Sequence, residues 1–331
     1  MTFRLADAEP SPDSFAAVMA TGILSIAAAK HQYGRFSDTL GVLATVGLLV
    51  LVVLVLLTKA IASWDLKEPD VTLRLFTFVA ACAVLDSRLA SYRAVLQMLG
   101  VVALLSSLVL IVPSVRDMSA HPWRELRDRS HGAWELASVG TSGLAIVATL
   151  VARHTPERWW LGLAVPVWAV ALCIYALMTW LIVWRAVAQR HERGGAAGFE
   201  PDSWILMGGL AIATLAGDDI HILAPAGLGP TVRMVTVVTW VAATLWIPPL
   251  VYFGLQRLSR RPAMLRFAGV WWALVFPLGM YSAATDVMGA ELGRRSLSTV
   301  SLVFFWDALA AWLIVAVAGV LRAVGTRESS D

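Results

Sequence analysis

The sequence predicts an all-α integral membrane protein, with ten transmembrane helices arranged as five hairpins in a single domain, residues 1–331. Composition is the first reason: 58% of residues are hydrophobic and 15% are charged, and mean hydropathy is +0.72. Soluble domains are nearer half apolar and a quarter charged. The second reason is that four long runs contain no Asp, Glu, Lys or Arg: 40–58, 94–115, 159–184 and 234–256. Since about 20 apolar residues cross a bilayer as a helix, each run predicts a span.

The third observation is a repeat. Charges and turn residues divide the chain into ten candidate spans, at about 12–30, 40–63, 70–90, 93–115, 131–152, 159–184, 201–220, 231–256, 266–286 and 297–322. Even-numbered spans are rich in Leu, Val and Ile, whereas odd-numbered spans are richer in Gly, Ser, Thr and Ala. Two helices per repeat give every repeat the same orientation. The predicted hairpins are therefore approximately 12–63, 70–115, 131–184, 201–256 and 266–322.

Three odd-numbered spans begin with nearly the same phrase: "PDSF" at 12–15, "EPDV" at 68–71 and "EPDSW" at 200–204. Proline suits the first position of a helix, where its missing N–H costs nothing. The aspartates that follow, Asp13, Asp70 and Asp202, would face the positive end of the helix dipole. We therefore interpret them as helix-start residues in preference to ligands.

Basic residues set the predicted orientation. Most of the 26 Lys and Arg residues fall in loops on the side of the N-terminus, so the positive-inside rule places both termini in the cytoplasm and the protein in the cytoplasmic membrane. The apolar run 14–29 could be taken for a signal peptide, but Asp7, Glu9 and Asp13 precede it against Arg4 alone, the wrong charge for such a segment. Nothing indicates a nucleic-acid partner.

The odd-numbered spans carry small and hydroxyl residues at positions that would suit the lining of a conduit. A tightly packed bundle is the alternative, since small residues also let helices approach closely. We expect transport, with these candidate pore-lining residues: Thr21, Gly22, Ser25, Ser138, Thr141, Gly208, Gly209, Thr214, Gly279 and Ser282.

Span nine, "FAGVWWALVFPLGMYSAAT" at 267–285, resembles the tellurite-resistance/dicarboxylate transporter family. That family includes bacterial tellurite-resistance channels, the fungal malate permease (a C4-dicarboxylate transporter), fungal sulfite exporters and the slow anion channel of plant guard cells. Further matches are "PDSFAAVMATGI", "HGAWELASVGTSGLAIV" and "PDSWILMGGLAIATLAG", so the resemblance covers essentially the whole chain.

The resemblance implies five hairpins around a pseudo-five-fold central pore, usually in a homotrimer with one pore per protomer. It also implies that a phenylalanine just before the span-nine proline plugs the pore. Here these residues are Phe276 and Pro277. The expected partners are the lipid bilayer and small anions, with dicarboxylate such as malate, sulfite, tellurite, chloride and nitrate as candidates.

Acidic residues inside spans leave a second hypothesis open, because intramembrane carboxylates are costly and often functional. Glu135 or Asp218 could bind a proton and make the protein a proton-coupled dicarboxylate carrier. Asp307, within span ten, is expected to pack between helices or to accept hydrogen bonds from Trp and Ser. Arg88 is expected to pair with Asp86 or to extend to the membrane interface.

Two other classes compete with transport. Asp218, Asp219 and His221 offer oxygen and nitrogen donors within four residues, which could make an intramembrane metalloenzyme. No second ligand cluster accompanies them, so we expect no metal, no cofactor and no enzymatic activity. A structural or partner-binding membrane subunit is the remaining alternative, and the polar odd-numbered spans argue against it.

Overall fold

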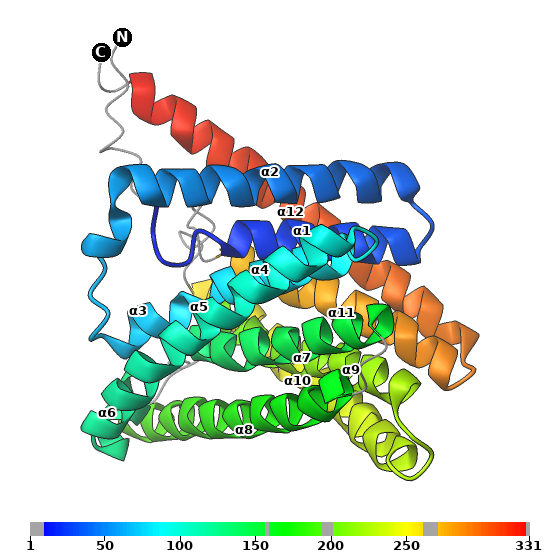
Figure 1. The fold of residues 1–331 in the computed structure, drawn as a ribbon. Coiled ribbons are helices and arrows are strands. Elements are labelled where there is room, and N and C mark those ends of the chain that lie inside the picture. The colour runs from blue at the N-terminus through cyan, green and yellow to red at the C-terminus, as the bar shows by residue number, and fades with distance from the viewer. Residues whose placement is uncertain (1–9, 156–158, 194–200, 261–270, 329–331) are drawn as a thin grey trace.

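The computed structural model describes residues 10–155, 159–193, 201–260 and 271–328, and within these ranges every regular element is a helix (Figure 1). The predicted start of the fifth hairpin, at residue 266, lies outside the described residues. The helices are, in order, α1 (Ala16–Lys30), α2 (Gly34–Thr58), η2 (Ala60–Ala62), α3 (Pro69–Arg74), α4 (Phe76–Arg88), α5 (Arg93–Ala120), α6 (Trp123–Arg129), η3 (Gly132–Glu135), α7 (Leu136–His154), α8 (Trp159–Arg193), η4 (Pro201–Trp204), α9 (Ile205–Leu223), α10 (Gly229–Arg260), α11 (Trp272–Glu291) and α12 (Arg295–Glu328).

Seven helical segments of the described chain are long and apolar enough to cross a membrane: 34–58, 93–120, 132–154, 159–189, 201–223, 229–256 and 295–322. Helix α1 is apolar but shorter, with 15 residues. These lengths and compositions agree with the predicted all-helical integral membrane protein.

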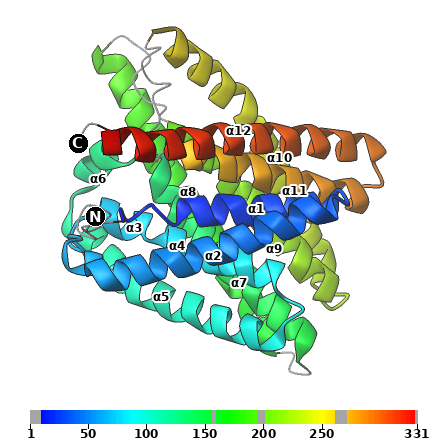
Figure 2. The same cartoon turned by 90° about the horizontal axis from the view of Figure 1, so that it is seen from above.

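Five helices contact one another in a closed cycle: α1 with α4, α4 with α7, α7 with α9, α9 with α11, and α11 with α1. We call them the ring helices. Each packs against the long helix that follows it in the chain, which gives the outer helices α2, α5, α8, α10 and α12. Figure 1 shows α2 running antiparallel beside α1, and Figure 2 shows the same bundle from a second direction.

Burial separates the two sets of helices. In the span that contains α7, 78% of the residues of the most apolar window are buried, against 28% in α2 and 22% in α5. The outer helices carry large apolar side chains on their free faces, for example Val109 and Ile314, each 70% exposed. Apolar surface of this extent is unfavourable in water and suits hydrocarbon. The outer faces are therefore the ones that contact lipid.

The beginnings of the repeats differ from the prediction. Pro69 opens α3 as expected, but Pro12 lies in a turn closed by the bonds from Ser14 N–H to Ser11 O and from Ala16 N–H to Asp13 O. Pro201 opens a short 3₁₀ helix. The predicted span 70–90 is also two helices, because α3 ends at Arg74 and α4 starts at Phe76.

Gly132, the first residue of η3, packs directly against the backbone of η4. A Cβ added to Gly132 would lie 2.2 Å from the carbonyl oxygen of Asp202 and 2.5 Å from the amide nitrogen of Ser203. Both contacts are main-chain atoms, which cannot rotate away. Only glycine lets η3 and η4 pack at this distance.

We predict that Gly132→Ala destabilises the protein by about 3 kcal/mol or more, since two helix starts must separate to admit the methyl group. Thermal unfolding of the purified protein in detergent measures this. Gly162→Ala is the matched control, because nothing lies within 4 Å of a Cβ at Gly162. Equal melting temperatures for the two variants would contradict the packing described above.

Candidate functional site

A cavity of about 130 Å³ lies between the C-terminal halves of the five ring helices. We call it the axial cavity because every ring helix contributes to its wall. Most of the wall is apolar. The lining residues are Ile23, Ile26 and Lys30 of α1, Ala83, Val84 and Ser87 of α4, Gly143 and Ile146 of α7, Ile212, Leu215, Asp218 and Asp219 of α9, and Met280 and Val287 of α11.

The charged side chains of the axial cavity gather at its polar end. Arg153 donates to Asp219, with 2.6 Å between guanidinium nitrogen and carboxylate oxygen. Lys30 lies 4.0 Å from Asp286. Asp218, the sequence-predicted candidate for proton binding, makes no hydrogen bond or ion pair with any residue that the structure describes. It is therefore the one carboxylate of this wall that is not matched to a described cation.

Phe276 lies one helical turn deeper than the axial cavity. Residues 276, 280 and 287 share one face of α11 at 3.6 residues per turn, and Met280 and Val287 line the cavity. Phe276 therefore belongs to the same stripe, about 6 Å toward the N-terminal end of the helix. Its side chain is completely buried. Phe276 is not itself among the residues that line the cavity.

Pro277 and Gly208 position this part of α11. Pro277 lies inside the helix, where proline removes a backbone hydrogen bond and bends the chain. A Cβ at Gly208 of α9 would lie 3.0 Å from the ring of Pro277. The proline ring therefore packs directly against the neighbouring ring helix at a position that carries no side chain.

The hydroxyl residues predicted to line a conduit make bonds away from the axial cavity. Ser138 donates to a carbonyl of α8, and Ser282 donates to one of α12. Thr214 contacts Thr239 of α10 at 3.0 Å. The others behave alike: Thr21 accepts from Trp312 of α12, Ser25 donates to the carbonyl of Ser37 in α2, and Thr141 donates to its own helix. None of them is among the residues that line the axial cavity.

The predicted glycines lie at helix contacts. A Cβ at Gly22 would lie 2.8 Å from Val84 of α4, and one at Gly279 would lie 3.0 Å from Ile23 of α1. Gly209 faces the ring of Tyr175 on α8, at 3.2 Å. The role of these glycines and of the hydroxyl residues in lining a pathway remains a prediction.

Glu135 lies between α7, α8 and α9 and is completely buried. One carboxyl oxygen accepts a 2.7 Å hydrogen bond from Thr179 of α8. The second has no hydrogen-bond partner among the described residues and lies 3.9 Å from where a Cβ of Gly209 would be. Glu135 is thus held at an interface of ring and outer helices and is not part of the axial-cavity wall.

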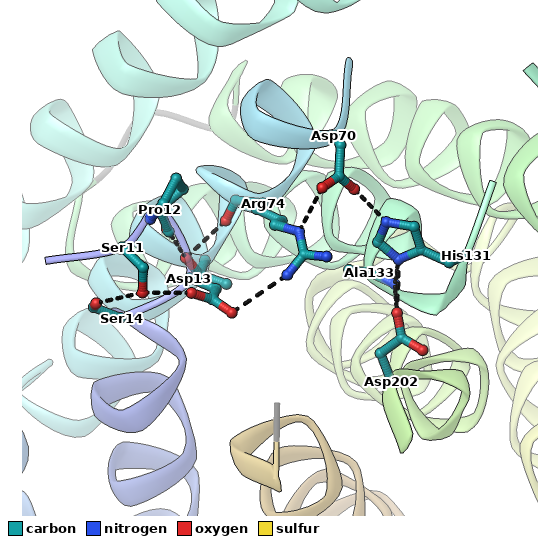
Figure 3. A network of polar contacts seen from close by, with 10 residues as sticks. Ser11, Pro12, Asp13, Ser14, Asp70, Arg74, His131, Ala133 and Asp202 are labelled. Carbon is teal, nitrogen blue, oxygen red and sulfur yellow. Dashed lines mark hydrogen bonds and ion pairs between the residues drawn. The ribbon is translucent and has the colours of Figure 1, made fainter. Parts of the chain in front are cut away.

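At the opposite end of the ring helices, the repeat-start aspartates meet in one charged network (Figure 3). Arg74 contacts Asp70 at 2.9 Å and Asp13 at 3.4 Å. His131 contacts Asp70 through Nε2 and Asp202 through Nδ1, the latter at 2.7 Å. We call these five residues the charge arc. It joins the starts of four ring helices, since Asp13 precedes α1, Asp70 and Arg74 precede α4, His131 precedes α7 and Asp202 precedes α9.

The two carboxylates of the charge arc favour a protonated His131, although the N–H of Ala133 also lies 3.3 Å from Nδ1. Both ring nitrogens face carboxylate oxygens, and only the imidazolium form donates from both. Burial lowers the pKa of His131, but the hydrogen bonds and charges of Asp202 and Asp70 outweigh burial and raise it to about 9. Burial raises the pKa of Asp70, yet His131 and Arg74 lower it overall. The aspartates therefore have a second role besides starting helices, which is to form ion pairs between repeats.

Sequence reasoning missed His131 and Arg74. Neither residue is among the candidate site residues that the sequence predicts. A signal was present, because "HGAW" at 131–134 parallels "PDSW" at 201–204. The histidine stands where the other repeats have proline, beside the aspartates that begin them.

The structure contradicts the expected pairing of Arg88 with Asp86 and the expected packing of Asp307 between helices of this chain. Arg88 does not pair with Asp86; its guanidinium donates to Ser25 and to Asp38, each at 2.7 Å. Asp307 does not pack between helices, because it is exposed on α12. The pattern of charges along the chain gave no information on which face of each helix these side chains occupy.

The candidate metal ligands Asp218, Asp219 and His221 do not form one cluster of side chains. Asp219 pairs with Arg153, and His221 Nδ1 lies 3.1 Å from the carbonyl oxygen of Gly229. Among the described residues there is no group of three or more His, Cys, Asp or Glu side chains that could hold a metal ion.

Residues 10–320 match the family model described as voltage-dependent anion channel. The chain is also similar to two uncharacterized membrane proteins of Mycobacterium tuberculosis, one from strain CDC 1551 / Oshkosh and one from strain H37Rv. Each is 32% identical over 126 residues, which is 37% of this chain. The match covers 64% of each relative, so the chain spans less than two thirds of the curated relatives it matches.

The charge arc predicts a pH-dependent stability. The folded protein holds the His131 proton up to about pH 9, whereas a free histidine releases it near 6.5. The arc therefore stabilises the fold fully below about pH 6.5 and loses its contribution as pH rises through about 9. We expect an effect of about 1 to 3 kcal/mol, reduced by solvent screening because the side chain of Asp70 is 42% exposed.

Melting temperatures measured between pH 6 and pH 10 test this, with His131→Gln as the variant that cannot take up the proton. The difference between wild type and His131→Gln should be large at pH 6 and shrink by pH 10. A difference that stays constant over this range would rule out a protonated His131.

Proposed function

Because the chain belongs to the voltage-dependent anion channel family, we propose that it conducts small anions along the axis of its five ring helices, with Phe276 as the gate. The family supports anion transport in general and a multi-pass location in the membrane. The observation that carries the finer proposal is the axial cavity. All five ring helices line it, and Phe276 is a buried residue on the face of α11 that Met280 and Val287 continue into the cavity wall.

The proposed architecture is ten transmembrane helices in five hairpins around a pseudo-five-fold axis. Its support is the closed cycle of ring helices, each followed by an outer helix that packs against it. In this proposal α1, α4 and α11, which are not among the seven long apolar segments, also cross the membrane, packed against α2, α5 and α12 respectively. The whole chain then forms one transmembrane domain around one pore.

The proposed gate works by steric block. An aromatic ring on the axis fills a bore that is lined by apolar side chains, and such constrictions also exclude water and ions by dewetting. Pro277 interrupts the backbone bonding of α11 next to the ring, and Gly208 leaves room beside the proline. Together these two residues allow α11 to bend at the gate.

The residues that line the proposed pathway favour weak discrimination between small anions. In the axial cavity most contacts are with Ile, Val, Leu and Met side chains, and Lys30 is the one basic residue of the wall. A passing anion therefore meets few groups that could recognise one chemical species. We propose dicarboxylate, sulfite, tellurite, chloride and nitrate as the candidate substrates to be compared directly.

Orientation follows from the basic loops. We propose that the charge arc faces the cytoplasm and the axial cavity opens to the exterior, with both termini cytoplasmic and the protein in the cell membrane. In Figure 1, α1 begins and α12 ends at the same side of the bundle, as an even number of spans requires.

We propose that the protein assembles as a homotrimer. The position of Asp307 supports an interface between copies of this chain. It lies 12 residues into the span 295–322, which is about 18 Å along the helix, and it is exposed on α12. A carboxylate that faces hydrocarbon at this depth is costly. Contact with a neighbouring subunit would remove it from lipid.

Proton-coupled dicarboxylate transport is the second candidate. The observation that favours it is Asp218, which lines the axial cavity and has no partner among the described residues. A carboxylate on the path of an anion repels it unless the carboxylate binds a proton. Flux that responds to a pH gradient separates the carrier from the channel.

We predict that Phe276→Ala raises anion flux several-fold in proteoliposomes, because the side chain that fills the bore is removed. The panel of anions named above is measured with and without a pH gradient. Phe305→Ala is the matched control: Phe305 is also completely buried, but it packs against Tyr33 and His31 away from the axial cavity. Unchanged flux in a correctly folded Phe276→Ala protein would contradict the gate.

We predict that Asp307→Leu weakens the oligomer, whereas Asp307→Asn, which keeps a hydrogen-bonding group, retains it. Mass measurement by light scattering in detergent reports the assembly state. If Asp307 faced lipid in the assembled protein, leucine would raise the melting temperature and leave the mass unchanged. That outcome would refute the interface.

A further inference from the structure

Asp86 is a buried acid that the proposed anion pathway does not use. It lies near the C-terminal end of α4, three residues before Leu89, where the helix ends. Its exposed fraction is 0%. No hydrogen-bond donor among the residues that the structure describes reaches either of its carboxyl oxygens.

The carboxyl group lies where α4, α5 and α7 meet. A Cβ added to Gly100 of α5 would lie 3.8 Å from Asp86 Oδ2 and 2.9 Å from Val147 of α7. Two neighbours of Asp86 on α4, Ala83 and Ser87, line the axial cavity. Asp86 therefore lies directly behind the wall of that cavity, in the layer between ring and outer helices.

The charged groups on the surrounding helices are engaged elsewhere. On α4 itself, Arg88 turns to Ser25 and Asp38. The remaining titratable and charged groups of the packed elements are, by element, Cys82 one turn along α4, Lys30 of α1 near Asp286, Arg35 and Asp38 of α2, and Asp70 and Arg74 of α3 in the charge arc. Helix α5 adds Arg93, exposed at its start, and the pair Arg116 and Asp117 near its other end, and α7 adds Arg153 with Asp219 and His154, whose Nδ1 contacts the carbonyl of Leu150.

An ionised carboxylate in this position would be strongly unfavourable. Burial of a charge without a partner costs far more than burial of the neutral acid. The C-terminal end of α4 adds to this cost, because the helix dipole is negative there. We propose that Asp86 is a proton-binding site, which holds its proton as a neutral carboxylic acid between the axial cavity and α5.

The site has a structural consequence. Release of the proton requires the charge to be solvated, and solvent reaches Asp86 only if the junction of α4, α5 and α7 opens. Gly100 makes this junction tight, since it brings the backbone of α5 close to Val147. The protonation of Asp86 and the closure of the cavity wall are therefore linked. The proposal does not depend on anion conduction.

Infrared difference spectroscopy of wild type against Asp86→Asn, in lipid at pH 7, tests the proposal. We expect the wild type to show the C=O stretch of a protonated carboxylic acid that the variant lacks, shifted when H₂O is replaced by D₂O. Asp38→Asn is the matched control, because the side chain of Asp38 is 78% exposed and paired with Arg88. Its difference spectrum should show a carboxylate.

A second readout is stability against pH. Asparagine has the shape of the neutral acid, so Asp86→Asn should melt with the wild type near pH 6. At alkaline pH the wild type should fall below the variant. A carboxylate signal from Asp86 at pH 7, or wild-type and variant melting curves that stay parallel, would overturn the proposal.

If Asp86→Asn fails to fold, the sample is instead protein with the native Asp86, labelled with ¹³C at the aspartate carboxyl carbons. It carries Asp218→Asn, which removes the other unpaired aspartate of the cavity region. This protein must show a protonated-aspartate band at pH 7. Absence of the band overturns the proposal.

Discussion

The structure depends on one constraint: inside a bilayer, each polar group must find its partner within the protein. The ring helices meet this demand by turning their hydroxyl groups outward. Ser138 reaches a carbonyl of α8, and Ser282 reaches one of α12. Such bonds fasten α1, α7, α9 and α11 to the outer helices that follow them. What remains for the axis is the apolar face, and this is why Ile, Val, Leu and Met dominate the cavity wall.

Much of the fold was predictable from the sequence. Runs without charge mark four of the five outer helices, because a charge that faces lipid is costly. The family was also predictable, since the match over residues 10–320 agrees with the motifs of span nine. Helix boundaries were less predictable. The break at Leu75 between α3 and α4, for example, has no proline or glycine beside it in the sequence.

The candidate site was harder to predict, because residue type does not determine direction. A serine in a small-residue helix looks equally suited to a pore or to a helix contact. Arg88 and Asp86 are close in the sequence, which made an ion pair a natural expectation. Residues two positions apart on a helix, however, point in different directions. His131 needed the three-dimensional neighbourhood of Asp70 and Asp202. Each failure concerns the face of a helix, which depends on tertiary contacts.

The common direction of the ring helices has one more effect. Four of their starting points meet in the charge arc, and the C-terminal halves of all five surround the axial cavity. Their peptide dipoles are consequently parallel and add along the axis. An ion in the middle of the bundle experiences a built-in field of fixed sign. In the proposed pathway this field would make inward and outward currents differ at equal driving force, without any moving part.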